Sequence, residues 1–339
     1  RSIARSVRRS RWSRWRTRRS TRGAEIFIRA LNGNYTLINA RSGCGFNPLS
    51  LPDTAENRTY LLEWLQMLVT VRGENLSAAD ISVLNSAIDG NYKLDPADRY
   101  LSNVIPFLGI ENDDNSLATR IAMWHGKGSH ARLFDNQIDK INLNDKLVYG
   151  FEMGQLLQDK IALGPVLSYL FHRISLSLDG TPTMVVLDEA WALIDNPIFA
   201  PKIKDWLKVM RKLNAMVVFA TQSVEDAAKS EISDTLIQQT ATQIFLPNLK
   251  ATDAYRTAFM LSAREYNLIK TTDPGSRFFL VKQSQHAVIA RINLSGMDDI
   301  INVLSGRSET TALVHDLINK HGEHPDNWLP TFYQKAKTV

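Results

Sequence analysis

The chain has 339 residues, of which 44% are hydrophobic and 22% are charged, as is ordinary for a globular protein. No run of about 18 uncharged apolar residues occurs, and the basic N-terminus is not followed by an apolar stretch, so the sequence predicts neither a membrane-spanning helix nor a signal peptide. The single cysteine, Cys44, excludes an internal disulfide and a cysteine-cluster metal site.

Residues 1–22 differ in composition from the rest of the chain. They hold ten arginines and no acid; without those ten, the 40 basic residues fall to 30 against 35 acidic ones, so the body is mildly acidic. One interpretation is an arm for nucleic acid or an acidic membrane, in which arginines bind phosphates and Trp12 and Trp15 stack on bases. The interpretation that we favour is non-native sequence from a shifted reading frame, disordered and outside the fold.

Residues 23–52 predict the start of an α/β core. The segment GAEIFIRAL has the spacing of a short amphipathic helix, and YTLINA at 35–40 has the character of a strand. A glycine-rich turn follows and closes at Pro48 and Pro52.

Residues 53–136 predict helices alone, and we interpret them as an all-helical insertion. Asp53 or Thr54 is positioned to cap a helix whose apolar residues recur every three or four positions. Ser77, with Asp80 three residues later, has the pattern of a capping box at the start of the next helix.

Strands alternate with helices in residues 137–339, which predicts the remainder of the core as a mainly parallel sheet with crossover helices. The expected strands are short apolar runs of the kind buried in such a sheet, at residues 147–153, 184–190, 216–223 and 242–248. Residues 277–294 predict a hairpin that turns at Gln283 to His286.

The strongest chemical signal is the run MVVLDE, in which apolar residues from Met184 lead into Asp188 and Glu189. Ligands of open α/β sheets bind beyond the carboxyl ends of the strands. In a nucleotide hydrolase Asp188 would hold Mg²⁺, usually through a water, and Glu189 would polarise the attacking water. The alternative is a solvated pair of acids that merely ends a strand.

Two further residues fit the same chemistry. Gln222 follows the next apolar run, where it could contact a γ-phosphate or the attacking water, although a simple turn is equally compatible with the pattern. Arg211 near a helix end could complete a neighbouring subunit's site as an arginine finger. A basic last turn that complements the helix dipole is the alternative, and we prefer it for Lys212.

The sequence contains no phosphate-binding loop of the form Gly-x-x-x-x-Gly-Lys-[Ser/Thr]. Its Gly126-Lys127 pair is followed by Gly128, and Ile121 stands where the first glycine should be. No apolar strand precedes the pair, so we interpret HGKGSH as a loop. The histidines show no paired-ligand spacing, and His172 is expected to pack in a helix rather than to act in catalysis.

Long segments of the chain resemble the CagE/TrbE/VirB ATPases, the fourth VirB component of type IV secretion and conjugation machines. They are RGAEIFIRAL, GFNPLSLPDTAENR, VVLDEAW, IKDWLKVMRKLN, VVFATQSVEDA, QQTATQIFLPN, SRFFLVKQ, LSGMDDIINVLSGR and PDNWLPTFY, spread from Arg22 to about Tyr333. The resemblance implies an α/β, RecA-like P-loop NTPase core, here without the phosphate-loop strand and helix, and with the all-helical insertion.

The resemblance also implies roles for residues that match the family's motifs. Asp188 matches the Walker B aspartate, Glu189 the catalytic glutamate, Gln222 the nucleotide sensor and Arg211 the trans-acting finger. The late motif adds three cofactor-binding candidates, Arg277, Lys282 and Gln283. The implied cofactors are ATP and Mg²⁺, bound weakly or not at all by this chain.

The resemblance begins at Arg22. In the family, the phosphate loop, its helix and a strand directly precede the matching position, whereas residues 1–21 of this chain match nothing in the family. A frame slip at about Arg22 explains both the missing loop and the arginine-rich tail, and it predicts a sheet edge left open where the strand is absent. For the intact parent the resemblance implies a hexameric ring, peripheral at the cytoplasmic face of the bacterial inner membrane. Its implied partners are other secretion components of that membrane, with DNA among the candidate substrates.

Two other functions stay open on the sequence. A DNA-translocating pump of the coupling-protein, FtsK or HerA type would share the same core, although the acidic body shows no obvious DNA track. A non-enzymatic assembly module would instead bind secretion-system partners through the helical insertion.

Overall fold

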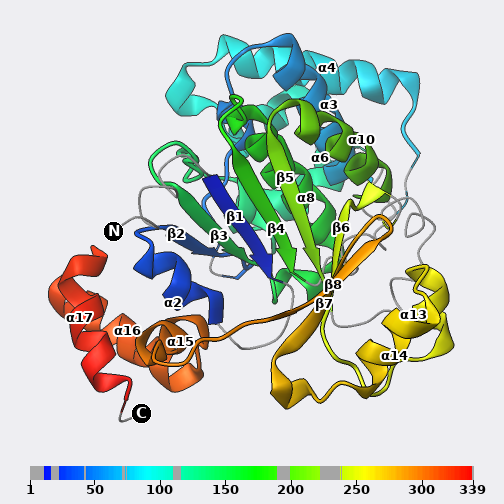
Figure 1. Cartoon of the computed structure of the whole chain (residues 1–339). Helices are drawn as coiled ribbons and strands as arrows, with labels where there is room; N and C mark the ends of the chain where they lie inside the picture. Colours follow the sequence, from blue (N-terminus) through cyan, green and yellow to red (C-terminus); the bar gives the residue numbers. More distant parts are fainter. Residues whose placement is uncertain are drawn as a thin grey trace.

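The computed structural model describes residues 11–16, 23–41, 43–70, 73, 75–109, 116–188, 199–221, 237 and 239–337. A five-stranded sheet in the order β2-β3-β1-β4-β5 forms its centre (Figure 1). Every neighbouring pair in this sheet is parallel, as the alternation of strands and helices predicts. Its strands are β1 (Arg11–Arg16), β2 (Asn34–Leu37), β3 (Val148–Glu152), β4 (Thr183–Asp188) and β5 (Ala215–Ala220).

Strand β1 contradicts the expectation that the arginine-rich tail lies outside the fold. Residues 11–16 pair in parallel with β3 on one side and with β4 on the other, so the sheet has no gap between those two strands. The reason is that the backbone N–H and C=O groups of β3 and β4 need partners, which any extended segment can supply whatever its side chains. The rest of residues 1–22 lies outside the described part of the chain.

Strand β5 also differs from the prediction of a run buried on both sides. It is the edge strand, and Val217 and Phe219 pack on the core while Met216 and Val218 are 52% and 36% exposed. Helix α10 (Phe199–Lys212) packs against the core side, where the Trp206 ring meets Phe171 of helix α8 (Lys160–Ser177) at 4.4 Å between centroids. The apolar run therefore predicts the strand correctly but not its half-exposed state.

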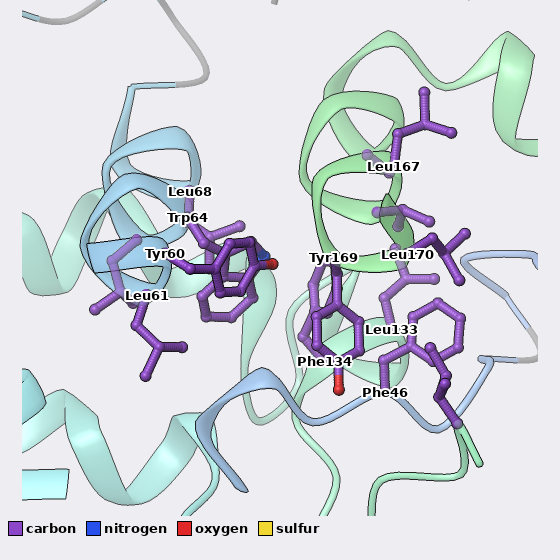
Figure 2. Packing of buried hydrophobic residues seen from close by; sticks show 14 of the residues in the cluster. Phe46, Tyr60, Leu61, Trp64, Leu68, Leu133, Phe134, Leu167, Tyr169 and Leu170 are labelled. Atoms are coloured by element: carbon purple, nitrogen blue, oxygen red, sulfur yellow. The ribbon is translucent and has the colours of Figure 1, made fainter. Parts of the chain in front are cut away.

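Helix α8 (Lys160–Ser177) lies between the sheet and the insertion. Every residue from Ala162 to Leu170 is buried, which is the pattern of a helix covered on all sides. Figure 2 shows side chains of helix α3 (Ala55–Val69) and of α8 meeting in this core. Tyr60 stacks on His172 with ring centroids 3.8 Å apart, and the His172 ring hydrogen-bonds Asn57 at 2.8 Å, so His172 packs as expected.

The described part of residues 53–136 contains helices and turns but no strand, as predicted. Thr54, rather than Asp53, caps the first helix by accepting a hydrogen bond from the Asn57 N–H, and Ser77 with Asp80 forms the predicted capping box. The helices are α3 (Ala55–Val69), α4 (Ala78–Lys93), α5 (Leu101–Val104), α6 (Leu117–Ile121) and α7 (Ala131–Phe134), with short 3-10 turns between them.

A second sheet holds the strands after residue 240. β6 (Thr242–Phe245), β7 (Phe278–Gln283) and β8 (His286–Arg291) pair antiparallel, so the hairpin is confirmed. The expectation that β6 joins the parallel sheet is wrong, because its backbone partners are in β7. Helices α13 (Asp253–Ala258) and α14 (Ala263–Thr271) pack on one face of this sheet around Phe245 and Leu280.

The C-terminal helices pack on the first helix of the core. α2 (Gly23–Ala30) meets α15 (Asp298–Leu304), α16 (Ser308–His321) and α17 (Pro325–Lys335) (Figure 1). Ile26, Trp328 and Phe332 are fully buried there. Within the described residues, no helix is both long and apolar enough to cross a membrane.

Candidate functional site

Asp188 is the last residue of β4 and lies beside Ala220, the last residue of β5. Val185 and Leu187 of the same strand are fully buried, so the strand is anchored in the core up to its carboxyl end. Alternation along the strand puts Asp188 on the opposite face from Leu187, where it is half-buried. The structure therefore places the first acid at the sheet edge where the sequence predicts it.

Glu189 and Gln222 lie outside the described residues, so their predicted roles remain predictions. The described chain stops at Asp188 on β4 and resumes with α10; on β5 it reaches Thr221, an exposed residue directly before Gln222.

Arg211 lies in the last turn of α10 and is exposed. Helix α10 ends at the start of β5, where the Thr183 N–H of β4 donates to the carbonyl of Asn214. Arg211 is thus next to the amino end of β4, about 16 Å along the strand from Asp188 at 3.3 Å per residue. Arg211 therefore lies toward the opposite end of the strand from the acid of its own chain, and both of its interpretations, a basic last turn that complements the helix dipole and a role in a neighbouring subunit, stay predictions.

The three late-motif candidates belong to the second sheet rather than to the parallel sheet. Arg277 precedes β7 in a left-handed conformation with φ of 60°, and Gln283 ends the strand at the hairpin turn. The Lys282 ammonium donates to Glu265 at 3.1 Å and to the Met260 carbonyl at 2.7 Å. Lys282 thereby ties the hairpin to α14, a structural function that the sequence did not indicate.

Glu152, a buried acid at the carboxyl end of β3, is not among the residues that the sequence predicts for the site. It is 7% exposed and accepts hydrogen bonds from the Tyr35 hydroxyl at 3.0 Å and from the Gly154 N–H at 3.1 Å. In the sheet β1 separates β3 from β4, which puts the β3 and β4 backbones about 10 Å apart. Like Asp188, it ends an apolar run, VYGFE, and that pattern was the available signal.

The loop HGKGSH is confirmed as a turn and does not form a phosphate cradle. It links the 3-10 helix at Ala122–Trp124 to α7, with no strand before it. The Gly126 N–H donates to the Asp135 carboxylate at 2.8 Å, and the Gly128 N–H donates to the His125 carbonyl at 2.9 Å. Because these N–H groups already have protein acceptors, they do not form the ring of free donors that binds phosphates in a phosphate loop.

The residues present fit one half of a magnesium–nucleotide site. Mg²⁺ is commonly held by one or two carboxylates together with substrate phosphates, so Asp188 at the sheet edge is a suitable ligand. No cluster of three or more potential metal ligands occurs among the described residues. The triphosphate half, a glycine-rich loop with its lysine, does not occur in the sequence.

Known proteins resemble this chain over most of its length. The model of the TraG P-loop domain matches residues 112–273. VirB4 of Bartonella henselae is 37% identical over 318 residues, which are 93% of this chain and 40% of that protein. VirB4 of Brucella abortus is 34% identical over 326 residues, which are 93% of this chain and 39% of that protein. The chain belongs to the VirB4 family of type IV secretion proteins.

A differently named type IV secretion protein is also similar to this chain. PtlC of Bordetella pertussis, a type IV secretion protein, is 33% identical over 322 residues. This VirB4-family chain spans about two fifths of the length of the curated relatives that it matches.

Solved structures show the fold. VirB4 of Thermoanaerobacter pseudethanolicus superposes with a TM-score of 0.66 at 18% identity, covering 88% of this chain and 85% of that one. The plasmid coupling protein TrwB, in complex with an ATP analogue, gives a TM-score of 0.50 at 12% identity, covering 87% of this chain and 80% of that one. The chain therefore has an α/β P-loop NTPase fold.

Proposed function

We propose that this chain is the motor portion of a type IV secretion ATPase that powers pilus assembly or substrate translocation. The observation that carries the proposal is the position of Asp188, at the carboxyl end of a buried parallel strand in a VirB4-family fold. Without a phosphate loop in its sequence, the chain by itself binds ATP weakly or not at all.

Each site residue has a distinct task in this proposal. Asp188 holds Mg²⁺ through a water, and the ion supplies charge neutralisation between the phosphates. Glu189 orients and polarises the attacking water, and Gln222 senses the γ-phosphate. Arg211 reaches into the site of a neighbouring subunit, which its distance from the acid of its own chain supports.

Arg277, Lys282 and Gln283 are kept as outer contributors to nucleotide binding. Lys282 is engaged with Glu265, so we assign it to positioning of the hairpin rather than to direct phosphate contact.

The intact protein acts as a hexameric ring at the cytoplasmic face of the inner membrane, associated peripherally with other secretion components. Adjacent subunits complete each site in such a ring. The relatives' assignment to type IV secretion systems supports this placement.

A chimera tests the proposal directly. Residues 1–22 are replaced by the segment that precedes the matching region in the Bartonella henselae VirB4, which supplies a phosphate loop if the family has one there. We expect the chimera to hydrolyse MgATP, and Glu189→Gln to reduce turnover by about 10²–10⁴-fold while nucleotide binding persists. Binding of MgATP without turnover by the unmutated chimera would contradict the proposal.

Subunit mixing tests the role of Arg211 in trans. Arg211→Ala in the chimera should lower turnover by roughly 10³-fold or more, whereas Lys212→Ala, the adjacent exposed cation, serves as the matched control. Mixing Arg211→Ala subunits with Glu189→Gln subunits should restore part of the turnover, because some interfaces then contain both residues. No recovery in mixed assemblies would show that Arg211 does not act across the interface.

A further inference from the structure

Two adjoining segments, the loop after β2 and the loops that flank the short helix α7, carry exposed cations that have no acidic partner. Arg41 lies in the loop after β2; Lys127, Arg132 and Lys140 lie between residues 125 and 140, and all four are exposed. Across the described part of the chain, no carboxylate lies within ion-pair distance of any of them. We call these four residues, together with Ile138, the cationic loop surface.

Hydrogen bonds to backbone carbonyls hold the two segments together. The Arg132 guanidinium donates to the Arg41 carbonyl at 2.7 Å, and the Lys140 N–H donates to the Gly45 carbonyl at 2.8 Å. Gly43 has a positive φ of 75°, and a Cβ there would lie 2.6 Å from the Arg132 carbonyl oxygen. Glycine at position 43 therefore permits the close approach of the segments that carry Arg41 and Arg132.

The two acids of these segments, Asp135 and Asp139, are engaged by other residues. Asp135 accepts hydrogen bonds from Ser102 at 2.8 and 2.6 Å and from the Gly126 N–H at 2.8 Å. Asp139 pairs with Arg173 and accepts from the Tyr169 hydroxyl at 2.5 Å. Neither carboxylate neutralises the exposed cations, so the surface is positive although the body of the protein is acidic.

The exposed side chain of Ile138 favours an anionic bilayer over a nucleic acid as the partner of this surface. It is 75% exposed, the highest value among the large hydrophobic side chains of the described residues, and it lies between Arg132 and Lys140 in the chain. The aromatic residues of the two segments, Phe46 and Phe134, are buried, so no ring is offered for base stacking. Exposed cations around an exposed aliphatic side chain are the features of a peripheral contact with an anionic bilayer.

We propose that the cationic loop surface docks on the anionic headgroups of a membrane, with Ile138 entering the headgroup region. Arg41, Lys127, Arg132 and Lys140 bind lipid phosphates from the water side. This inference rests on the proposed peripheral association with the membrane and assigns that association to the cationic loop surface. Its test requires no nucleotide, so its failure leaves the hydrolysis proposal standing.

A fluorescent probe at position 138 tests insertion independently of the arginine-rich residues 1–22. Cys44, the single cysteine, is replaced by alanine, and an environment-sensitive dye is attached to Ile138→Cys or, as control, to Lys93→Cys on the exposed surface of α4. Vesicles of equimolar phosphatidylglycerol and phosphatidylcholine should shift the emission of the dye at 138 to the blue, and pure phosphatidylcholine should not. The dye at 93 should stay unchanged with both.

Neutralising substitutions then measure the electrostatic part. Each cation near an anionic surface contributes roughly fivefold in partitioning, so Lys127→Gln with Lys140→Gln, which keeps the Arg132 contact with Arg41, should weaken the response at 138 by about 25-fold. Lys93→Gln with Lys320→Gln, two exposed cations elsewhere, is the matched control and should leave the response unchanged. Added salt should weaken binding of the unmutated protein.

Two results would overturn the proposal. One is co-sedimentation with anionic vesicles without any change of the dye at 138, which would assign binding to another part of the chain. The other is a change at 138 on addition of a duplex DNA oligonucleotide but not of vesicles, which would make the surface a nucleic-acid contact.

Discussion

Trp124 and Trp64 are both fully buried in the insertion core, but only one of them makes a hydrogen bond. The Trp124 indole N–H donates to the Leu68 carbonyl at 3.1 Å, whereas that of Trp64 has no hydrogen-bond partner among the described residues. Both rings pack against Phe134, with centroids 5.8 and 5.1 Å from it. Phenylalanine at each position therefore separates the value of the hydrogen bond from that of the ring.

The expected magnitudes follow from these contacts. Each substitution removes about 50 Å² of buried apolar surface, which stabilises by about 1.3 kcal/mol at 25 cal/mol per Å². Trp124→Phe also loses a hydrogen bond worth about 1 kcal/mol and leaves the Leu68 carbonyl short of a donor. Trp64→Phe removes an unpaired buried donor instead. We expect losses of about 2–4 kcal/mol for Trp124→Phe and about 0–1.5 kcal/mol for Trp64→Phe.

Urea unfolding followed by far-ultraviolet circular dichroism measures both losses. The apolar cluster continues from the insertion helices to the sheet, so each variant should still unfold in a single transition. Equal losses for the two variants would refute the role given to the Trp124 hydrogen bond, and a separate early transition would show that the insertion has a core of its own.

Two further predictions concern local contacts. Ser77→Ala opens the capping box of α4 and should lower the free energy of unfolding by about 1 kcal/mol in thermal denaturation, whereas Ser86→Ala on the exposed face of the same helix should not. Burial raises the pKa of Glu265, but hydrogen bonds from Ser262 and Lys282 outweigh it, so the pKa lies below its ordinary value. Its stabilising effect is therefore present above the unfolded pKa of about 4.3 and is lost as pH falls through the folded pKa. Glu265→Gln should be less stable than the unmutated protein at neutral pH, and the difference should shrink in acid; a difference that is constant with pH would contradict this.

Local signals in the sequence predict the helices of the insertion well. The capping box of α4 depends on Ser77 and Asp80, three residues apart, and the apolar spacing after Thr54 defines the buried face of the preceding helix, α3. Such contacts lie within one turn of the chain, so the sequence contains all that they require.

Pairings between distant strands are less accessible from the sequence. An apolar run predicts β6 as a strand but not its partner, because β7 follows only after an intervening pair of helices. Strand β1 was missed since its arginines and tryptophans do not form the apolar run expected at the centre of a parallel sheet. Its place is fixed by backbone pairing with β3 and β4.

The candidate site was predicted only in part, because some of its residues follow local patterns and others depend on the order of distant strands. Asp188 was found because the apolar run before it identifies both the strand and the edge at which it ends. Glu152 was missed although it ends a similar run, because a single acid after a strand is a weak signal until the sheet order places it near Asp188. The engagement of Lys282 with Glu265 depends on a hairpin folding onto α14, which spacing alone does not show.

We propose that this chain has the magnesium-binding and water-activating acids of the site but no triphosphate cradle. Calorimetric titration of MgATP into the unmodified chain tests this directly, because it measures nucleotide binding. We expect no heat beyond that of dilution at micromolar nucleotide. Saturable binding with a micromolar dissociation constant would contradict it.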